Sequence, residues 1–129
     1  MTGYDAAQQA LILLNYTDAE GAADQRQNVE FIKRALPVLN TLLADILPLT
    51  GGEYAPLATL ASPLPLTDTL AMRLLVPGVA MHFAAGEGDG DNYNRFSQEY
   101  ATRRSAVRRP ARRILDVMPE YSPRRPPSR

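Results

Sequence analysis

The sequence of 129 residues contains no cysteine and no tryptophan, and its single histidine is His82. The lack of cysteine excludes disulfides, thiolate metal sites and cysteine nucleophiles. A single histidine excludes a zinc site made of several histidines of one chain, and it leaves one candidate base for a histidine-dependent triad. The sequence has no Gly-x-Ser-x-Gly segment to supply that base with a serine nucleophile. We therefore expect His82 to be a structural side chain, and we expect no enzymatic activity, no bound metal and no cofactor.

Long apolar runs are also missing, and we expect no segment that spans a membrane, because a span needs roughly 20 apolar residues. The run Leu11–Leu14 is too short for a signal peptide and follows no basic residue. Apolar residues nevertheless make up 45% of the chain and charged residues 22%, which is typical of a soluble folded protein. The length corresponds to about one domain.

The net charge of zero hides two regions of opposite sign. Residues 1–102 carry five basic and twelve acidic side chains, which is a net charge of −7. Residues 103–129 carry nine arginines and two acidic side chains, which is a net charge of +7. Such an asymmetry indicates a basic segment that binds an acidic protein surface or a nucleic acid.

Hydrophobic periodicity predicts four main helices. The first is predicted to begin with a capping box at Thr2–Asp5 and to run to about Asn15. In the second, apolar residues recur at spacings of three and four over the range 29–46. Pro37 lies inside this range and predicts a kink or a break just before it.

The third predicted helix spans about 69–85 and follows a cap at Thr67–Asp68. Pro77 and Gly78 interrupt its pattern, and close packing against another helix would explain the glycine. Asp91 is predicted to cap the fourth helix, which has three aromatic residues on one face that we expect to be buried. These residues are Tyr93, Phe96 and Tyr100.

A long connection rich in proline and leucine, Pro48–Thr67, separates the second and third helices. A connection this apolar is laid across the core, folded as a short hairpin, or buried against another subunit. The predicted fold class is therefore all-α: a small bundle of about four helices, with this long loop between helices 2 and 3 and an extended basic C-terminal tail. We divide the chain into a helical domain, 1–110, and a basic segment rich in proline and arginine, 111–129.

The acidic turn Gly86–Gly90 has some features of a calcium loop and of a phosphate loop, but it matches neither. Counted from Glu87, the sixth position of a calcium loop is Asn92 instead of glycine, and the twelfth is Gln98 instead of glutamate. The turn also lacks the Lys-Ser/Thr pair of a phosphate loop. We expect it to be a turn that leads into a helix cap.

Arginine pairs recur every four to five residues after the fourth predicted helix has begun. On a helix, residues at this spacing lie on neighbouring faces and form a basic stripe. Such a stripe contacts phosphates, docks on an acidic protein surface, or is only a solvated surface. No signature of a base-reading module is present, so we expect no sequence-specific recognition of nucleic acid. The candidate docking residues are Arg103, Arg104, Arg108, Arg109, Arg112 and Arg113.

Three stretches of the sequence carry a resemblance to a known family. They are a leucine-rich helix that ends in Asp-Ile (35–46), the segment Leu74-Leu75-Val76-Pro77-Gly78-Val79-Ala80, and the acidic turn followed by Asn92-Tyr93-Asn94-Arg95-Phe96-Ser97-Gln98-Glu99-Tyr100. With these stretches, the range 24–109 resembles the small helical head–tail connector proteins of tailed bacteriophages, which are also called adaptor or head-completion proteins. The opening range 10–18 is similar to that family as well.

The resemblance implies a virion structural protein without enzymatic activity. Its subunits would form a ring of about twelve copies below the portal protein, extend the DNA channel and join the head to the tail. The implied partners are further copies of the chain, the portal, a tail-side neck or stopper protein, and DNA that passes through the channel without sequence specificity. The implied location is the neck of the virion, after assembly in the host cytoplasm and without contact to a membrane.

Two parts of the chain would make the contacts of such a ring. The arginine pairs would dock on the portal or on a neighbouring subunit. The loop between helices 2 and 3 would contact a neighbouring subunit or line the channel, because a ring buries apolar surface that a monomer would expose. Its candidate contact residues are Tyr54, Leu57, Leu60, Leu64 and Leu66.

The same sequence leaves two other functions open. The arginine-rich C-terminus is also typical of a protein that associates with nucleic acid through phosphate contacts, with an affinity that falls steeply as salt rises. A phage assembly or scaffolding protein is the third hypothesis, and it differs from a connector in being absent from mature particles.

Overall fold

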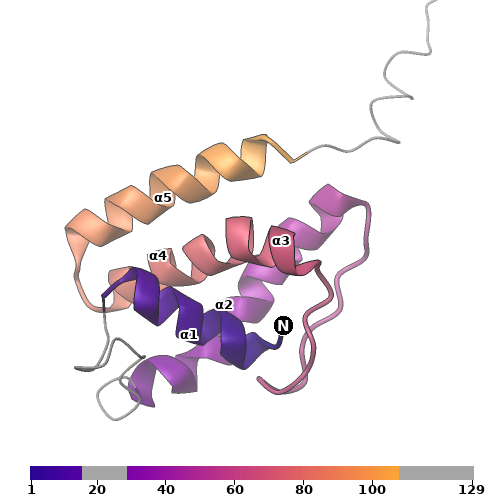
Figure 1. Cartoon of the computed structure of the whole chain (residues 1–129), viewed down its shortest axis with the longest axis horizontal. Coiled ribbons are helices and arrows are strands. Elements are labelled where there is room, and N and C mark those ends of the chain that lie inside the picture. Colours follow the sequence, from indigo (N-terminus) through magenta and orange to yellow (C-terminus); the bar gives the residue numbers. More distant parts are fainter. Residues whose placement is uncertain (16–28, 108–129) are drawn as a thin grey trace, which may run out of the picture.

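The computed structural model describes residues 1–15 and 29–107 (Figure 1). These residues form helices joined by turns and one long loop, and they contain no β-strand, although Thr2 and Pro63 form an isolated β-bridge. The predicted all-α fold with four main helices is confirmed. The elements in chain order are α1 (Gly3–Leu13), α2 (Val29–Ile46), the 3₁₀ turn η1 (Leu47–Thr50), α3 (Asp68–Leu70), the π-helical segment η2 (Ala71–Leu75), α4 (Val76–Gly86) and α5 (Gly90–Ser105).

The helix α4 is the centre of the bundle. It packs against α1, α2 and α5, and most of its apolar residues are buried, although Met81 is only partly buried and Ala85 is exposed. In Figure 1, α1 and α5 lie on either side of α4. The core includes large side chains from each main helix, among them Leu11, Leu39, Leu43, Phe83 and Phe96.

The helix α1 begins with the predicted capping box. The Oγ1 atom of Thr2 accepts a hydrogen bond from the backbone N–H of Asp5 at 3.2 Å, and the Asp5 carboxylate accepts one from the backbone N–H of Thr2 at 3.0 Å. The hydrogen bond from the backbone N–H of Thr2 lowers the pKa of Asp5, because it favours the charged form of the carboxyl group. The reciprocal contacts satisfy two N–H groups that no helical carbonyl reaches.

The helix α2 continues through Pro37, so the break predicted there is absent. Proline removes one hydrogen bond of the helix, but Pro37 lies on the exposed side. On the opposite side, Leu39, Leu43 and Ile46 are completely buried. Burial of this face stabilises the helix by more than the missing hydrogen bond destabilises it.

The segments α3, η2 and α4 follow one another without a gap and form one long helix, Asp68–Gly86. It begins as predicted, with the Oγ1 atom of Thr67 accepting a hydrogen bond from the N–H of Leu70 at 3.2 Å. The predicted interruption lies before Pro77 and Gly78, as the π-helical segment η2, while both residues belong to α4. Gly78 faces a close helix contact, as predicted: a Cβ atom there would lie 2.8 Å from Leu42 Cδ2 and 3.0 Å from Tyr100 Cε1.

This long helix corrects the expectation that no segment could span a membrane. It has 19 residues, an 18-residue window of it has a mean hydropathy of 1.3, and a helix of this length and composition is able to cross a bilayer. More than half of this window, 56%, is buried inside the bundle. Burial in the centre of the bundle therefore accounts for its apolar sequence.

The turn between α4 and α5 differs from the prediction in one detail. Asp89, and not Asp91, is the N-cap of α5: its carboxylate accepts hydrogen bonds from the backbone N–H of Asn92 at 3.3 Å and from Asn92 Nδ2 at 2.8 Å. Gly88 has a φ of +69°, a left-handed conformation that side chains disfavour. The turn is therefore built as a helix cap.

The aromatic face of α5 is buried only in part. Phe96 and Tyr100 lie in the core, as predicted. Tyr93 is 40% exposed, so its predicted burial is wrong. It lies in the first turn of α5, where it shares an open hollow with the small side chains of Ala84 and Ala85, and these do not cover its ring.

The loop 51–67 lies across the core, which was the first of the three predicted alternatives. Its Leu57 is held by Asn40 of α2, whose Oδ1 accepts from the Leu57 N–H at 2.7 Å and whose Nδ2 donates to the Leu57 carbonyl at 3.3 Å. The N-terminus holds its other half, since the N–H of Tyr4 donates to the Leu60 carbonyl and the N–H of Leu64 donates to the Met1 carbonyl, both at 2.9 Å.

Candidate functional site

The predicted docking arginines fall partly within the described residues. Arg103 and Arg104 form the last turn of α5. The other four, Arg108, Arg109, Arg112 and Arg113, lie outside the described residues. The structure therefore shows how the arginine-rich region begins, and the docking role of all six stays a prediction.

Arg104 is bound at the surface of the bundle by Asp45, near the end of α2. Its Nε and Nη2 atoms donate to the two oxygens of the Asp45 carboxylate at 2.7 and 2.8 Å, which is a bidentate contact. The hydroxyl of Tyr100 donates to the same carboxylate at 2.7 Å. We call these three residues the Asp45 cluster.

The Asp45 cluster shifts the pKa of each of its members. The hydrogen bond from Arg104 lowers the pKa of Asp45, and the bond from Tyr100 acts in the same direction. Burial raises the pKa of Tyr100, and its bond to the Asp45 carboxylate raises that pKa further. The contact with Asp45 also raises the pKa of Arg104. At neutral pH the cluster is therefore a carboxylate held by a guanidinium and a phenol.

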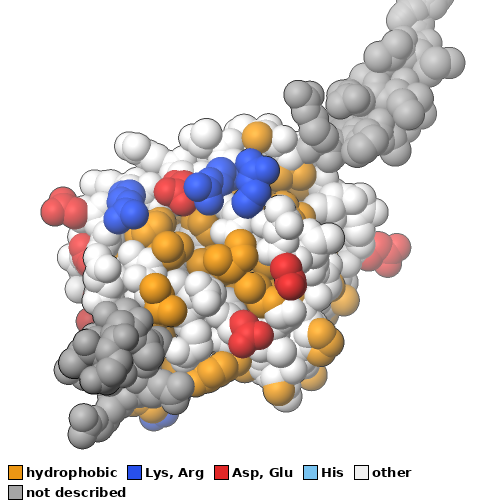
Figure 2. All heavy atoms as spheres, in the orientation of Figure 1, with side chains coloured by type: hydrophobic (Ala, Val, Ile, Leu, Met, Phe, Trp, Pro, Cys, Tyr) orange, Lys and Arg blue, Asp and Glu red, His pale blue; other side chains and the backbone are white. Residues whose placement is uncertain are grey.

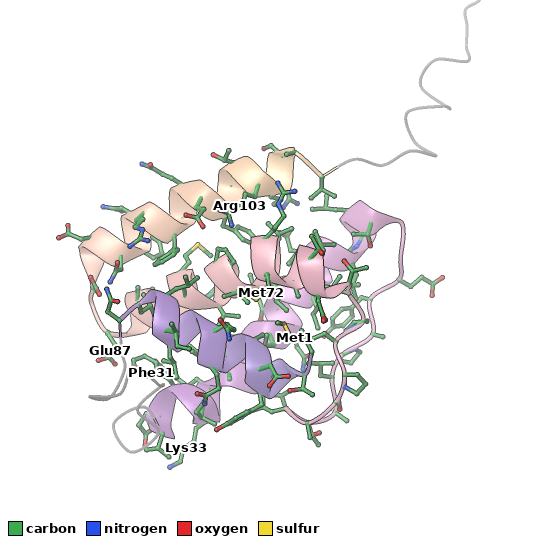
Figure 3. The ribbon with its side chains drawn as sticks, viewed as in Figure 1. Met1, Phe31, Lys33, Met72, Glu87 and Arg103 are labelled. Carbon is green, nitrogen blue, oxygen red and sulfur yellow. The ribbon has the colours of Figure 1, made fainter. Side chains whose placement is uncertain are left out.

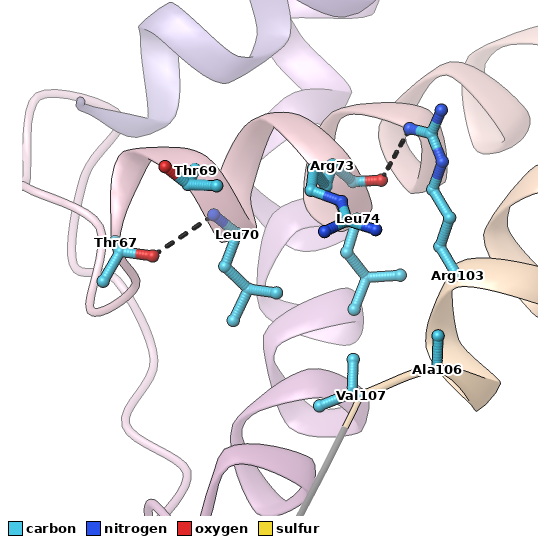
Figure 4. Close-up of a pocket in the computed structure, with 8 residues that line it drawn as sticks. All are labelled: Thr67, Thr69, Leu70, Arg73, Leu74, Arg103, Ala106 and Val107. Carbon is cyan, nitrogen blue, oxygen red and sulfur yellow. Dashed lines mark hydrogen bonds between the residues drawn. The ribbon is translucent and has the colours of Figure 1, made fainter.

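Arg103 is bound on the other side of α5. Its Nη1 atom donates to the backbone carbonyl of Arg73 at 2.9 Å (Figure 4) and also lies 3.2 Å from the Glu99 carboxylate. The Arg73 carbonyl is the one that residue 77 would bond in a regular helix, but Pro77 has no N–H to give. Arg103 thus gives the Arg73 carbonyl a hydrogen-bond donor in place of the N–H that Pro77 lacks.

Arg103 and Arg104 together fix where the arginine-rich segment leaves the bundle. One binds the helix Asp68–Gly86 and the other binds α2, so both anchor the end of α5. Sequence reasoning assigned both side chains to a partner and did not find Asp45 or the Arg73 carbonyl. The i, i+4 spacing of Tyr100 and Arg104 was the one available signal that the two share a contact.

A pocket of about 270 Å³ opens beside this end of α5 (Figure 4). The side chains of Leu70 and Leu74 point toward Val107, the last described residue (Figure 4). Arg73 and Arg103 line the same pocket. It therefore combines apolar side chains with two cations.

The predicted contact residues of the loop are divided by the structure. Leu57 and Leu64 are buried in the core of the single chain, so their side chains are not available to a neighbouring subunit or to a channel. Leu60 and Leu66 are partly buried against the core. Tyr54 is 46% exposed and is accessible to a partner. The expectation failed for the two buried leucines because the loop packs on its own bundle.

One face of the molecule combines charge with apolar surface. Figure 2 shows Lys and Arg side chains along α5, and hydrophobic side chains in the middle of the face, over α4 and between α5 and α1. Met72, which is 40% exposed, lies in this middle region (Figure 3). The face offers partners both a cationic edge and an apolar surface.

The remaining candidate site residues occupy ordinary structural positions. His82 is half-buried, and burial lowers its pKa because the charged imidazolium is disfavoured there. No group of three or more side chains within the described residues is placed to hold a metal ion.

Comparison of the chain with protein-family models, with curated proteins and with solved structures found no match.

Proposed function

We propose that this protein is a structural subunit of the neck of a tailed bacteriophage, a head–tail connector that forms a ring below the portal and acts by assembly. The sequence resemblance over the range 24–109 suggests this function. The structural observation that supports it is the fixed exit of the arginine-rich segment from a small helical bundle. A subunit that docks through this segment needs such a fixed exit, because an anchored start lowers the entropy lost on binding.

In the proposed assembly, different parts of the chain contact different partners. The arginines beyond Val107 bind acidic side chains of the portal or of a neighbouring subunit. The exposed Tyr54 and the partly exposed Leu60 and Leu66 contact the next copy in the ring. The net charge of −7 on residues 1–102 repels DNA phosphates, so that DNA slides through the channel without binding.

The experiment is negative-stain electron microscopy of the full chain mixed with its portal protein. We expect rings stacked on the portal, and we expect them to vanish when Arg108, Arg109, Arg112 and Arg113 are replaced by glutamate. The matched control replaces the same four residues with lysine, which keeps the charge. Absence of rings with the unmodified chain, over a range of protein concentrations and salt, would falsify the proposal.

Binding to nucleic acid is the second candidate, and the arginine content beyond the described bundle favours it. Seven of the fourteen basic residues of the chain follow Val107. This candidate predicts retention of duplex DNA on a gel that weakens steeply as salt rises and disappears with the four glutamate substitutions. DNA binding together with the absence of portal rings would favour it over the connector.

A further inference from the structure

The pocket beside the end of α5 has the chemistry of a peptide-binding site. Leu70, Leu74 and Val107 provide apolar contact surface, and the Arg73 and Arg103 side chains border it (Figure 4). A volume of about 270 Å³ accommodates one or two side chains and excludes a folded domain. The occupant is therefore a short segment of chain.

The charges around the pocket define what the segment must carry. Arg103 is already paired with Glu99, whereas Arg73 has no carboxylate partner among residues 1–15 and 29–107. A guanidinium beside apolar side chains favours a carboxylate that lies next to aliphatic residues. A free phosphate would leave the two leucines without contact. The segment is thus aliphatic with an acidic residue inside it.

The sequence of this chain contains one such segment after the pocket. Ile114-Leu115-Asp116-Val117-Met118 has four aliphatic or thioether side chains around a single carboxylate. The rest of the sequence after Val107 is dominated by arginine, proline and serine. Residues 114–118 lie outside the described residues, and neither the fold nor the docking arginines account for their apolar character.

We propose that the pocket binds the range 114–118 of a second copy of the chain, with the Asp116 carboxylate against Arg73 and the aliphatic side chains on Leu70 and Leu74. The charge distribution favours a second copy, because the +7 segment of one copy is attracted to the −7 region of another. Each copy has one segment and one pocket, so the exchange closes as a reciprocal pair or as a ring. The proposal does not depend on the connector function, since it concerns self-association alone.

Binding of the range 114–118 to the pocket of its own chain is disfavoured by the short stretch that connects the two. Only six residues, 108–113, connect Val107 to Ile114, and four of them are arginines. A reversal of the chain over so short a distance would crowd these arginines against Arg73 and Arg103, and like charges repel. Binding to a second copy requires no such reversal.

The test is sedimentation velocity of the full chain over a range of concentrations, with charge-exchanged variants. Arg73→Glu and Asp116→Arg should each weaken self-association by about tenfold or more, the equivalent of roughly 1.4 kcal/mol. An equimolar mixture of the two variants should associate again, because the mixture still contains an intact segment and an intact pocket. Arg95→Glu is the matched control, since it makes the same charge change on an exposed side chain of α5 outside the pocket.

The outcomes separate the alternatives. The double variant Arg73→Glu with Asp116→Arg should also recover association. Recovery in the double variant without recovery in the mixture would place the segment in the pocket of its own chain and overturn the proposal. Single variants that self-associate as strongly as the unmodified chain would overturn it as well. Circular dichroism melting of Arg73→Glu checks that the bundle itself is intact, and portal binding is measured separately.

Discussion

The helix α5 is attached to the bundle in two ways that differ in kind. In its middle it approaches α4 so closely that Gly78 has no room for a side chain between Leu42 and Tyr100. At its C-terminal end, Arg104 binds Asp45 at a surface where both side chains are about 40% exposed. Burial of apolar surface stabilises a fold more than an exposed ion pair does. The first contact should therefore provide stability, and the second should fix the position of the chain end.

The comparison is tested most strongly at Phe96. Its side chain is fully buried on α5, so Phe96→Ala should lower the free energy of unfolding by about 3 to 4 kcal/mol, measured by urea denaturation. Tyr93→Ala is the control, because it removes an exposed aromatic ring of the same helix and should lose less than about 1 kcal/mol. Equal losses at the two positions would show that the apolar contact is not dominant.

The close approach at Gly78 gives the next largest effect. Gly78→Val should destabilise the protein by about 2 kcal/mol, because the new side chain would overlap Leu42 and Tyr100. Adding Leu42→Ala makes room for it, so this second change should lower stability less in the Gly78→Val protein than in the unmodified one. Additive losses in this double-mutant cycle would contradict the steric explanation.

The ion pair between Asp45 and Arg104 should contribute less to the free energy of unfolding than these apolar contacts. Asp45→Ala should lower the free energy of unfolding by about 1 kcal/mol, because water already screens the exposed pair. Arg104→Lys should retain only part of the contact, since lysine cannot bind the carboxylate with two parallel donors. A double-mutant cycle measures the interaction energy between Asp45 and Arg104. A value above about 3 kcal/mol would show that this pair stabilises the fold as much as the apolar contact between α5 and α4 does.

The Asp45 cluster should make the free energy of unfolding decrease both at low pH and at high pH. The pKa of Asp45 is lower in the folded chain than its usual 3.8, so its contribution is present above that pH and is lost as the pH falls through the folded value. The pKa of Tyr100 is raised above 10.0, so its contribution is present below pH 10 and is lost as the pH rises. Urea midpoints against pH should show both losses, and Asp45→Asn should flatten the acid side.

The smallest effect is expected at Glu99. Its contact with Arg103 is between partly exposed side chains one helical turn apart, so Glu99→Gln should change stability by less than about 0.5 kcal/mol. Arg103 keeps its bond to the Arg73 carbonyl in this variant. Arg103→Gln should therefore lower the melting temperature more than Glu99→Gln does, and the reverse order would show that the carbonyl bond is unimportant.

Most of the local features of the fold were predictable from the sequence, although the cap of α5 and the effect of Pro37 were not, and most pairings of distant residues were not. The caps at Thr2 and Thr67 depend on neighbours three residues away, and the glycine at position 78 signalled a close helix approach. The pairing of Asp45 with Arg104 joins residues 59 positions apart. It depends on how two helices are placed relative to each other, which the spacing of residues within one helix does not determine. Leu57 and Leu64 were assigned to a partner for the same reason, since a leucine pattern does not identify the surface that it covers.

The π-helical segment determines how the side chains at one end of the long helix Asp68–Gly86 are rotated about the helix axis relative to those at the other end. An α-helix turns by about 100° per residue, so the wider turn at Ala71–Leu75 rotates everything before it relative to everything after it. Residues 76–86 can then present Gly78 to Leu42 and Tyr100 while Thr67 and Leu70 remain at the mouth of the pocket. Deleting one residue from Ala71–Leu75 would rotate the two halves of the helix relative to each other by about 100°. Gly78 could then not face Leu42 and Tyr100 while Leu70 still lines the pocket.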